Sequence, residues 1–291
     1  MLGSSSSSLS ATFLLMSVEC YFFQHGFGEY VGRYCTFFEE LSSKANIAIY
    51  SFDMHGHGRS EPKEEKSRAF VEHFEDLVDD ASQCLDIIKQ SQPMGIPLLV
   101  GGQSLGGLLA LHLLLKRQKD FSGLILHSAA LDVEWTPVLR WCQASIGDCL
   151  AGMCPYAKMV PAVRPQDMCE DPAVVEEYLK DPMIYQGNVK ANTGNEILNG
   201  FKKTANPALQ RQVTVPIYAC HGTSDRTTSL PAVRRFLKEA ASPDKTLNEV
   251  KGGYHELFWG PQKESVRASL VAWIVSHVSR GATESAIQVE V

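Results

Sequence analysis

The chain has 291 residues, 44% of them hydrophobic and 21% charged, so we expect one large α/β domain, or one domain with an inserted cap, around a sizeable core. The formal net charge of −6 argues against nucleic acid as the main partner. The eight cysteines contain no C-x-x-C pair, which argues against a zinc or thioredoxin-like site, and we expect reduced thiols. We expect neither a metal nor a cofactor.

The N-terminal segment is rich in serine at first and apolar afterwards. Residues 1–10 are predicted to be disordered. The apolar run Ala11–Phe23 has neither a positively charged leader nor an A-x-A cleavage site, so its second half is predicted to be a core strand. The apolar stretch Leu105–Leu115 is too short to span a membrane. We therefore expect a cytoplasmic protein, with membrane association left open.

Apolar strands alternate with amphipathic helices over most of the chain. In the first half, the pattern predicts strands at Val18–Gln24, Ile47–Phe52, Leu98–Val100 and Gly123–His127, and helices at Val31–Lys44, Phe70–Lys89 and Ser104–Lys119. In the second half, it predicts strands at Val215–Cys220 and Lys245–Val250, and helices at Pro231–Ala241 and Gln262–Ser279. This alternation is typical of a mostly parallel sheet with right-handed crossovers and helices on both faces.

The alternation stops between Leu131 and Asn206, where no strand is obvious and a helical cap is predicted. An apolar stripe runs from Trp135 to Met153, and a shorter helix covers Pro172–Lys180. Thr193–Glu196 has the form of a capping box that would start another helix. The stripe could simply pack on the main domain, or it could line an acyl pocket and touch a membrane.

The predicted domain organisation follows from these patterns. We expect a core formed by residues 11–131 and 207–280, with the cap at 132–206 inserted between its two parts. Residues 281–291 are expected to form a flexible tail.

The segment Gly102-Gln103-Ser104-Leu105-Gly106 has the G-x-S-x-G pattern of a nucleophile elbow. Small residues are needed two positions before and after the serine, because the strand and helix backbones nearly touch there. The turn would expose the Ser104 hydroxyl and direct the Leu105 N–H into the helix N-terminus, where negative charge is favoured. Taken alone, the pentapeptide could also be a glycine-rich turn with an incidental serine.

A serine nucleophile needs a base, an acid that orients the base, and donors for the oxyanion. Asp225 and His255 each lie in a loop after a predicted strand, in the chain order Ser, Asp, His. Singly, Asp225 could be a solvated turn residue and His255 an ordinary loop histidine. Together with the elbow they predict that Ser104 attacks, His255 acts as base and then acid, and Asp225 orients the imidazole. The Phe27 and Leu105 N–H groups are the expected oxyanion donors.

Other histidines are given structural roles. His25 is expected to orient the loop that carries Phe27, and the segment Asp53–Ser60 is interpreted as a turn that anchors the sheet edge. The segment His127–Asp132 also matches an H-x4-D acyltransferase pattern, which is short and carries little weight.

These motifs together resemble the monoacylglycerol lipase and lysophospholipase branch of the α/β-hydrolase superfamily. The resemblance extends from about residue 18 to 280 and is carried by six segments, His25–Tyr34, Asp53–Ser60, Gly102–Gly107, Asp181–Tyr185, His221–Asp225 and Tyr254–Leu257. It implies an α/β-hydrolase fold, a mostly parallel sheet flanked by helices, with a helical cap inserted before the last two core strands.

The resemblance also implies substrate-binding residues. Glu29 and Arg33 would lie near the glycerol head of the substrate, where a carboxylate can accept from hydroxyls and a guanidinium is rigid and always charged. Tyr185, in the cap segment, would join them. The alternative is that Glu29 and Arg33 form a helical i,i+4 ion pair of small energetic weight.

One departure from the family concerns the start of the chain. Family members begin with an extra β-hairpin before the first core strand, whereas about 17 residues precede it here and do not have that pattern. We therefore expect the sheet to lack its antiparallel edge and to expose a strand edge.

The sequence thus predicts a cofactor-independent serine hydrolase that cleaves a single-chain lipid ester, foremost monoacylglycerol to glycerol and fatty acid, through an acyl-enzyme on Ser104. Lysophospholipase, broad carboxylesterase and aminopeptidase activities use the same triad on this fold and stay open. A non-catalytic binding or membrane-docking protein is the alternative outside enzymes. The expected partners are the lipid ester and, through the cap, a membrane surface, and the oligomeric state is open.

Overall fold

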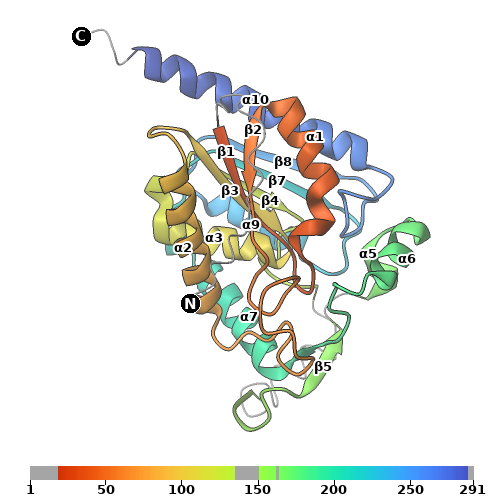
Figure 1. The fold of residues 1–291 in the computed structure, drawn as a ribbon. Helices are drawn as coiled ribbons and strands as arrows, with labels where there is room; N and C mark the ends of the chain where they lie inside the picture. Colours follow the sequence, from red (N-terminus) through yellow and green to blue (C-terminus); the bar gives the residue numbers. More distant parts are fainter. Residues whose placement is uncertain (1–18, 135–150, 162–163, 288–291) are drawn as a thin grey trace, which may run out of the picture.

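A six-stranded sheet forms the centre of the protein (Figure 1). The computed structural model describes residues 19–134, 151–161 and 164–287. The strand order is β2-β1-β3-β4-β7-β8, and every neighbouring pair is parallel. The strands are β1 (Glu19–Gln24), β2 (Ile47–Tyr50), β3 (Leu98–Gln103), β4 (Gly123–His127), β7 (Ile217–Gly222) and β8 (Lys245–Val250). The predicted mostly parallel sheet is therefore confirmed.

Successive side chains of a strand point to opposite faces of the sheet, so each face has a core of its own. Helices cover both cores. In β1, Cys20 and Phe22 enter one core and Tyr21 and Phe23 the other. The first core is covered by α2 (Phe74–Ser91), α3 (Leu105–Arg117) and α9 (Leu230–Glu239). The second is covered by α1 (Cys35–Ala45), which follows a 3₁₀ turn at Val31–Tyr34, and by α10 (Lys263–Ile287) (Figure 1).

The ends of the elements differ from the expectation in a few places. Helix α2 begins at Phe74 instead of Phe70. Helix α10 continues to Ile287, past Gly281, where the flexible tail was expected to begin. The predicted disordered segment 1–10 lies outside the described residues. Among the described strands, β2 and β8 are the sheet edges, and no antiparallel strand joins them.

The cap contains helices α5 (Pro165–Met168), α6 (Pro172–Lys180) and α7 (Ala191–Thr204), and α8 (Pro207–Gln210) follows it. It also contains an antiparallel ribbon of β5 (Lys158–Pro161) and β6 (Asn188–Lys190), so the expectation of a cap without strands is wrong. The two strands are only three and four residues long and far apart in the sequence, which leaves no local pattern to detect. Most of the stripe from Trp135 to Met153 lies outside the described residues.

The predicted capping box at Thr193–Glu196 is also wrong, because α7 already starts at Ala191. Its side chains instead serve the beginning of α2. Thr193 Oγ1 accepts from the Val71 N–H at 2.9 Å, and Glu196 Oε2 accepts from the N–H of Phe74, the first residue of α2, at 2.8 Å. A cap helix therefore supplies the N-terminal cap of a core helix, which fastens the two parts together.

Two features of the described residues bear on partners. No described helix has the length and hydropathy needed to cross a membrane. Within the same residues, no group of three or more His, Cys, Asp or Glu side chains is arranged to hold a metal ion.

Candidate active site

Ser104 lies on the predicted tight turn between β3 and α3. Its backbone has φ of 53° and ψ of −120°, a conformation that non-glycine residues seldom adopt and that costs on the order of 1–3 kcal/mol. A Cβ on Gly102 would lie 2.5 Å from the Gln24 carbonyl oxygen, and one on Gly106 would lie 2.1 Å from it. The two glycines are thus required by the approach of β1, which confirms the predicted elbow geometry.

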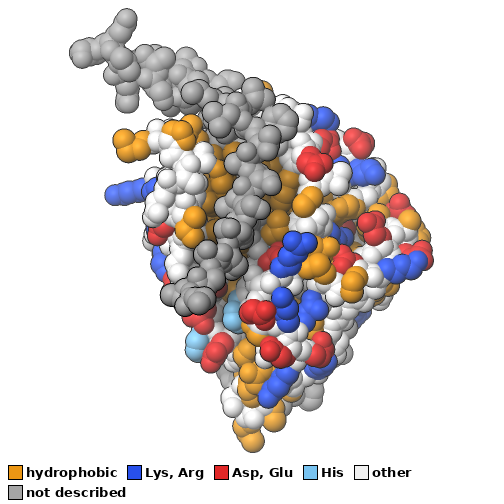
Figure 2. Space-filling view, viewed as in Figure 1, with side chains coloured by type: hydrophobic (Ala, Val, Ile, Leu, Met, Phe, Trp, Pro, Cys, Tyr) orange, Lys and Arg blue, Asp and Glu red, His pale blue; other side chains and the backbone are white. Residues whose placement is uncertain are grey.

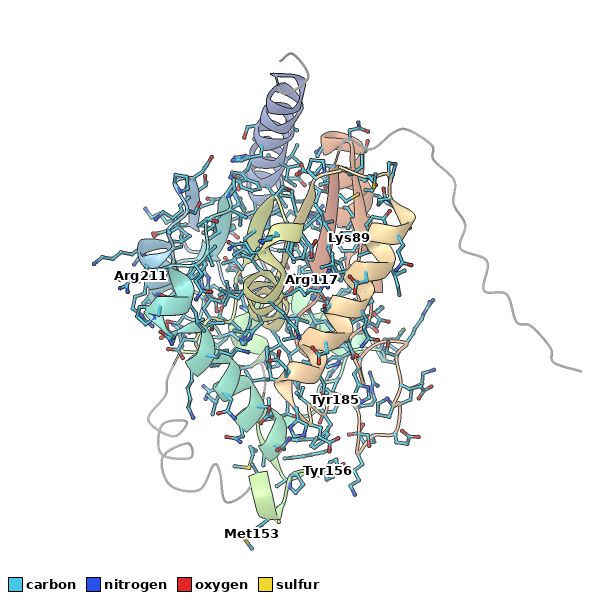
Figure 3. All side chains as sticks on the ribbon, turned by 90° about the vertical axis from the view of Figure 1, so that its left-hand side faces the viewer. Lys89, Arg117, Met153, Tyr156, Tyr185 and Arg211 are labelled. Carbon is cyan, nitrogen blue, oxygen red and sulfur yellow. The ribbon has the colours of Figure 1, made fainter. Side chains whose placement is uncertain are left out.

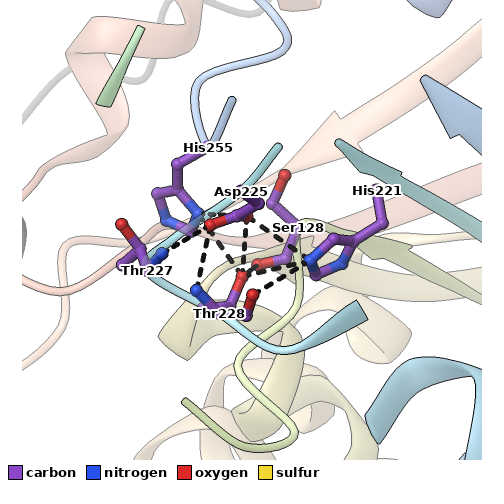
Figure 4. A network of polar contacts seen from close by, with 6 residues as sticks. All are labelled: Ser128, His221, Asp225, Thr227, Thr228 and His255. Atoms are coloured by element: carbon purple, nitrogen blue, oxygen red, sulfur yellow. Dashed lines mark hydrogen bonds and ion pairs between the residues drawn. The ribbon is translucent and has the colours of Figure 1, made fainter. Parts of the chain in front are cut away.

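Asp225 lies in a turn whose N–H and O–H groups donate hydrogen bonds to its carboxylate (Figure 4). Its Oδ1 accepts from the backbone N–H groups of Thr227 and Thr228 at 2.7 and 3.0 Å. Its Oδ2 accepts from the Thr228 hydroxyl at 2.9 Å and lies 2.8 Å from His255 Nδ1. The predicted pairing of acid and base is therefore present.

The electrostatics of this pair suit a catalytic base. Burial alone would raise the pKa of Asp225, but His255 and the turn donors hold it at about 2. Burial alone would lower the pKa of His255, but the Asp225 carboxylate raises it above its ordinary value. An ionised Asp225 favours the imidazole tautomer with its proton on Nδ1, which leaves Nε2 able to accept a proton.

His221 is a second histidine beside the same carboxylate, which the sequence analysis treated only as part of a motif. Its Nε2 lies 3.4 Å from Asp225 Oδ2, and the side chain is fully buried (Figure 4). Burial lowers the pKa of His221, so the ring is neutral at physiological pH. His221 and Thr228 therefore both contact the Asp225 carboxylate. Only these contacts in the folded structure identify the two residues as part of the site.

Ser104, Asp225 and His255 follow β3, β7 and β8, so all three lie at the carboxyl edge of the sheet, where open α/β sheets form their sites. The described contacts include no hydrogen bond between the Ser104 hydroxyl and His255. In enzymes without substrate this contact is often long and shortens when the substrate binds.

The loop after β1 lies against the nucleophile. A Cβ on Gly26 would lie 3.4 Å from Ser104 Cβ. His25 shapes the loop, because its Nε2 accepts from the Met54 N–H at 3.0 Å and its Nδ1 lies 2.8 Å from the Gly26 carbonyl. Among the described residues, the N–H groups of Phe27 and Leu105 donate to no acceptor, and their role as oxyanion donors stays a prediction.

Tyr185 links the cap to this loop. Its N–H donates to the Gly28 carbonyl at 2.7 Å, and its ring packs edge-on against Phe27 at 6.2 Å. Its hydroxyl donates to the Asn188 carbonyl at 3.1 Å, and the buried Lys190 ammonium lies over its ring at 4.4 Å. The side chain expected to bind substrate is therefore engaged in packing the cap onto the loop.

Glu29 and Arg33 are likewise engaged within the protein, and the contact with glycerol that the resemblance implies stays a prediction. Arg33 pairs with Glu29 and, at 3.0 Å, with Glu256, which the sequence analysis missed. Glu29 also accepts from the Tyr34 hydroxyl and from the Gly26 N–H. The i,i+4 pair of the alternative interpretation is present, but it is buried, and burial removes the solvent screening that makes such pairs weak.

His127 does not form an acyltransferase site. Its ring is 1% exposed and packs against Phe258 and Tyr218, with centroid distances of 4.3 and 5.8 Å. Burial lowers its pKa to about 3, so it is neutral and enclosed.

Comparisons with known proteins agree with this geometry. The profile of the family described as "Serine aminopeptidase, S33" matches residues 19–262. A monoacylglycerol lipase of Mycolicibacterium smegmatis is 27% identical over 256 residues, covering 87% of each chain. The human monoglyceride lipase is 29% identical over 241 residues, covering 81% of this chain and 75% of its own.

A solved structure has the same fold. The monoacylglycerol lipase of Paleococcus ferrophilus superimposes with a TM-score of 0.76 at 25% identity, covering 89% of this chain and 94% of its own. The family match spans most of the chain and the fold agrees over nearly its whole length, so the predicted fold and enzyme class are confirmed. The chain belongs to the serine aminopeptidase S33 family of α/β-hydrolases.

Proposed function

We propose that the protein hydrolyses carboxylic esters of single-chain lipids, foremost monoacylglycerol, through an acyl-enzyme on Ser104. The observation that carries the proposal is the Asp225–His255 pair, at 2.8 Å, at the same sheet edge as a serine in a strained elbow. Relatives named as monoacylglycerol lipases, which match along most of the chain, support the substrate.

In the first half of the reaction, Ser104 Oγ attacks the ester carbonyl carbon while His255 Nε2 takes the hydroxyl proton. The ester C–O bond then breaks, and the imidazolium returns that proton to the departing glycerol oxygen. Asp225 stays ionised throughout and stabilises the imidazolium. In the second half, His255 Nε2 takes a proton from a water whose oxygen attacks the acyl carbon. The bond from that carbon to Ser104 Oγ then breaks, the imidazolium returns the proton to Ser104 Oγ, and the fatty acid leaves.

The negative charge that develops on the carbonyl oxygen would be met by the Leu105 and Phe27 N–H groups. Leu105 is the first residue of α3, so the helix dipole adds to its donor strength. One such donor typically lowers the barrier by about 3 kcal/mol.

Among the alternatives, aminopeptidase activity has the least support. It would require acidic cap residues placed to hold the substrate amine. Glu176 and Glu177 are exposed on α6, and Glu176 pairs with Lys180. A lysophospholipase or a broad carboxylesterase would use the same machinery and differ only in the cap.

The test is turnover of a p-nitrophenyl ester by wild type and Ser104→Ala, with Ser91→Ala, at the end of α2, as the control. We expect Ser104→Ala to lose nearly all activity and Ser91→Ala to keep the wild-type rate. Equal rates in wild type and Ser104→Ala, or fluorophosphonate labelling at another residue, would overturn the proposal. A panel of monoacylglycerol, lysophosphatidylcholine and short soluble esters then ranks the substrates.

We further propose that the cap touches the lipid surface from which the substrate comes. Met153 is 77% exposed and Tyr156 37% exposed, and both lie at the far end of the cap (Figure 3). Hydrophobic side chains gather at this end of the molecule, with charged side chains next to them (Figure 2). Sedimentation with phosphatidylcholine vesicles should fall for a Met153→Asp, Tyr156→Asp variant, and unchanged sedimentation would contradict the contact.

A further inference from the structure

A second buried charge cluster lies beside the catalytic histidine. It consists of Glu29, Arg33 and Glu256, whose side chains are 5%, 10% and 4% exposed. Arg33 Nη1 contacts Glu29 Oε1 and lies 3.0 Å from Glu256 Oε2. Two carboxylates therefore share one guanidinium, and the cluster carries an excess negative charge when all three groups are ionised.

Arg33 is held from two further sides. Its guanidinium lies 4.0 Å from the ring centroid of Trp259 and 4.8 Å from that of Tyr178, a residue of cap helix α6. A guanidinium stays protonated at all accessible pH values, so any change of charge in the cluster must occur on a carboxylate. The Glu256 N–H also donates to the Met168 carbonyl of the cap at 2.8 Å, which fixes the backbone beside the base.

The cluster is joined to the reacting groups at two points. Glu256 follows His255 directly in the chain, and Glu29 accepts from the N–H of Gly26, the glycine that lies against Ser104. The charges of Glu256 and Glu29 both add to that of Asp225 in raising the pKa of His255. Burial raises the pKa of Glu256 itself to about 7, against the opposing effect of Arg33.

The titratable and charged groups that face His255 and Glu256 come from four parts of the protein. They are His221 in β7 and Asp225 after it, Glu29, Arg33 and Tyr34 after β1, Tyr178 of α6, and Cys169 between α5 and α6. Arg33 is the only cation among them that cannot lose its proton, and it is already shared by two carboxylates.

We propose that Glu256 is a positioning residue for the catalytic base, held by Arg33 beside His255 so that its charge stabilises the imidazolium formed when Ser104 attacks. The inference rests on the proposed function and adds to it a residue outside the triad. In the step concerned, the proton moves from Ser104 Oγ to His255 Nε2, and the oxygen forms its bond to the ester carbon. Glu256 exchanges no proton in this step and acts only through its charge.

The test is the pH dependence of the reaction at Ser104. The second-order rate of fluorophosphonate labelling and the kcat/KM for p-nitrophenyl acetate are measured across the acidic limb, in wild type and Glu256→Gln. Near and above pH 7, where Glu256 is ionised, removing its negative charge makes the imidazolium easier to deprotonate, so the upper part of the limb should move to lower pH by about 0.5 to 1 pH unit. Glu239→Gln, which removes an exposed carboxylate paired with Arg211, is the matched control and should superimpose on wild type.

The outcomes separate this inference from the proposed function. If folded Glu256→Gln has the wild-type profile, Glu256 is only structural and the inference is overturned. If that variant does not fold, Glu29→Gln removes the other carboxylate, and a shift in the same direction supports the inference while an unchanged limb overturns it. A wild-type protein that does not react at Ser104 at all would overturn the proposed function and, with it, the inference.

Discussion

Asp225 and Glu256 are two buried carboxylates near one histidine, His255, and they are held very differently. Asp225 receives hydrogen bonds from two backbone N–H groups and the hydroxyl of its own turn, besides the imidazole. Glu256 receives one from a guanidinium that Glu29 also uses. The pKa of Asp225 is lowered to about 2, whereas that of Glu256 is raised to about 7.

Burial is similar for the two groups, so it does not explain the difference. The donors do, because a carboxylate that accepts several N–H and O–H bonds is stabilised in its ionised form, and one beside another carboxylate is not. Asp225 is thus a fixed charge across the working pH range, and Glu256 is a charge that changes near neutrality. The predictions below test this contrast.

The largest effect is expected for Asp225→Asn, which keeps the shape of the side chain but removes its charge. The amide no longer holds His255 in the required tautomer, so kcat should fall by about 10⁴-fold. Ester hydrolysis at neutral pH measures the change, with Glu256→Gln as the comparison, for which we expect a loss below about tenfold. A value for Asp225→Asn within tenfold of wild type would contradict the assigned acid.

The next effect concerns stability. Arg33→Met leaves Glu29 and Glu256 buried without their cation, and breaking a buried ion pair in this way costs about 3–5 kcal/mol. Urea unfolding measures the loss. Arg211→Met, which breaks the exposed pair with Glu239, is the control and should change the midpoint little. Equal losses in the two variants would show that the buried cluster contributes no more than a surface pair.

The pH dependence of stability distinguishes the two carboxylates by sign. The folded protein keeps the Glu256 proton up to about pH 7, whereas the unfolded chain releases it near 4.5, so this contribution is lost as the pH rises between these values. Asp225 behaves in the opposite way, and its contribution is lost only as the pH falls from 3.8 towards about 2.

The measurement is the free energy of unfolding of wild type minus that of Glu256→Gln, followed from the acidic to the neutral range. The difference should decline steadily towards pH 7. A difference that is flat, or that grows with pH, would mean that Glu256 is ionised throughout and that the contrast with Asp225 is incorrect.

The smallest effect is expected for Thr228→Val, which removes the hydroxyl that donates to Asp225 Oδ2 at 2.9 Å. The loss of one hydrogen bond to a charged group costs about 1.5–3 kcal/mol and should raise the pKa of Asp225. Thr227→Val is the matched control, because the Thr227 hydroxyl has no partner among the described residues. The two variants are compared by thermal unfolding and by kcat. Similar values in both would show that the Thr228 hydroxyl does not contribute to the site.

Much of the fold could be predicted because it depends on local patterns. Strands β4 and β8 begin and end where the apolar runs predict. The positions of Asp225 and His255 followed from the ends of two predicted strands. The partners of Thr193 and Glu196 could not be predicted from a local pattern. The two residues have the spacing of a capping box, but they accept hydrogen bonds from residues near the start of α2.

The sequence by itself determined the elbow of Ser104 and the chain order of the triad, because glycine spacing and strand ends are local properties. Only the tertiary structure decided what the charged residues near the site do. Arg33 meets Glu256 across 223 positions of the chain, and Glu196 caps α2 across 122. A guanidinium in sequence alone could face either a substrate or a carboxylate, and the folding of distant loops against it determined that here it faces two carboxylates.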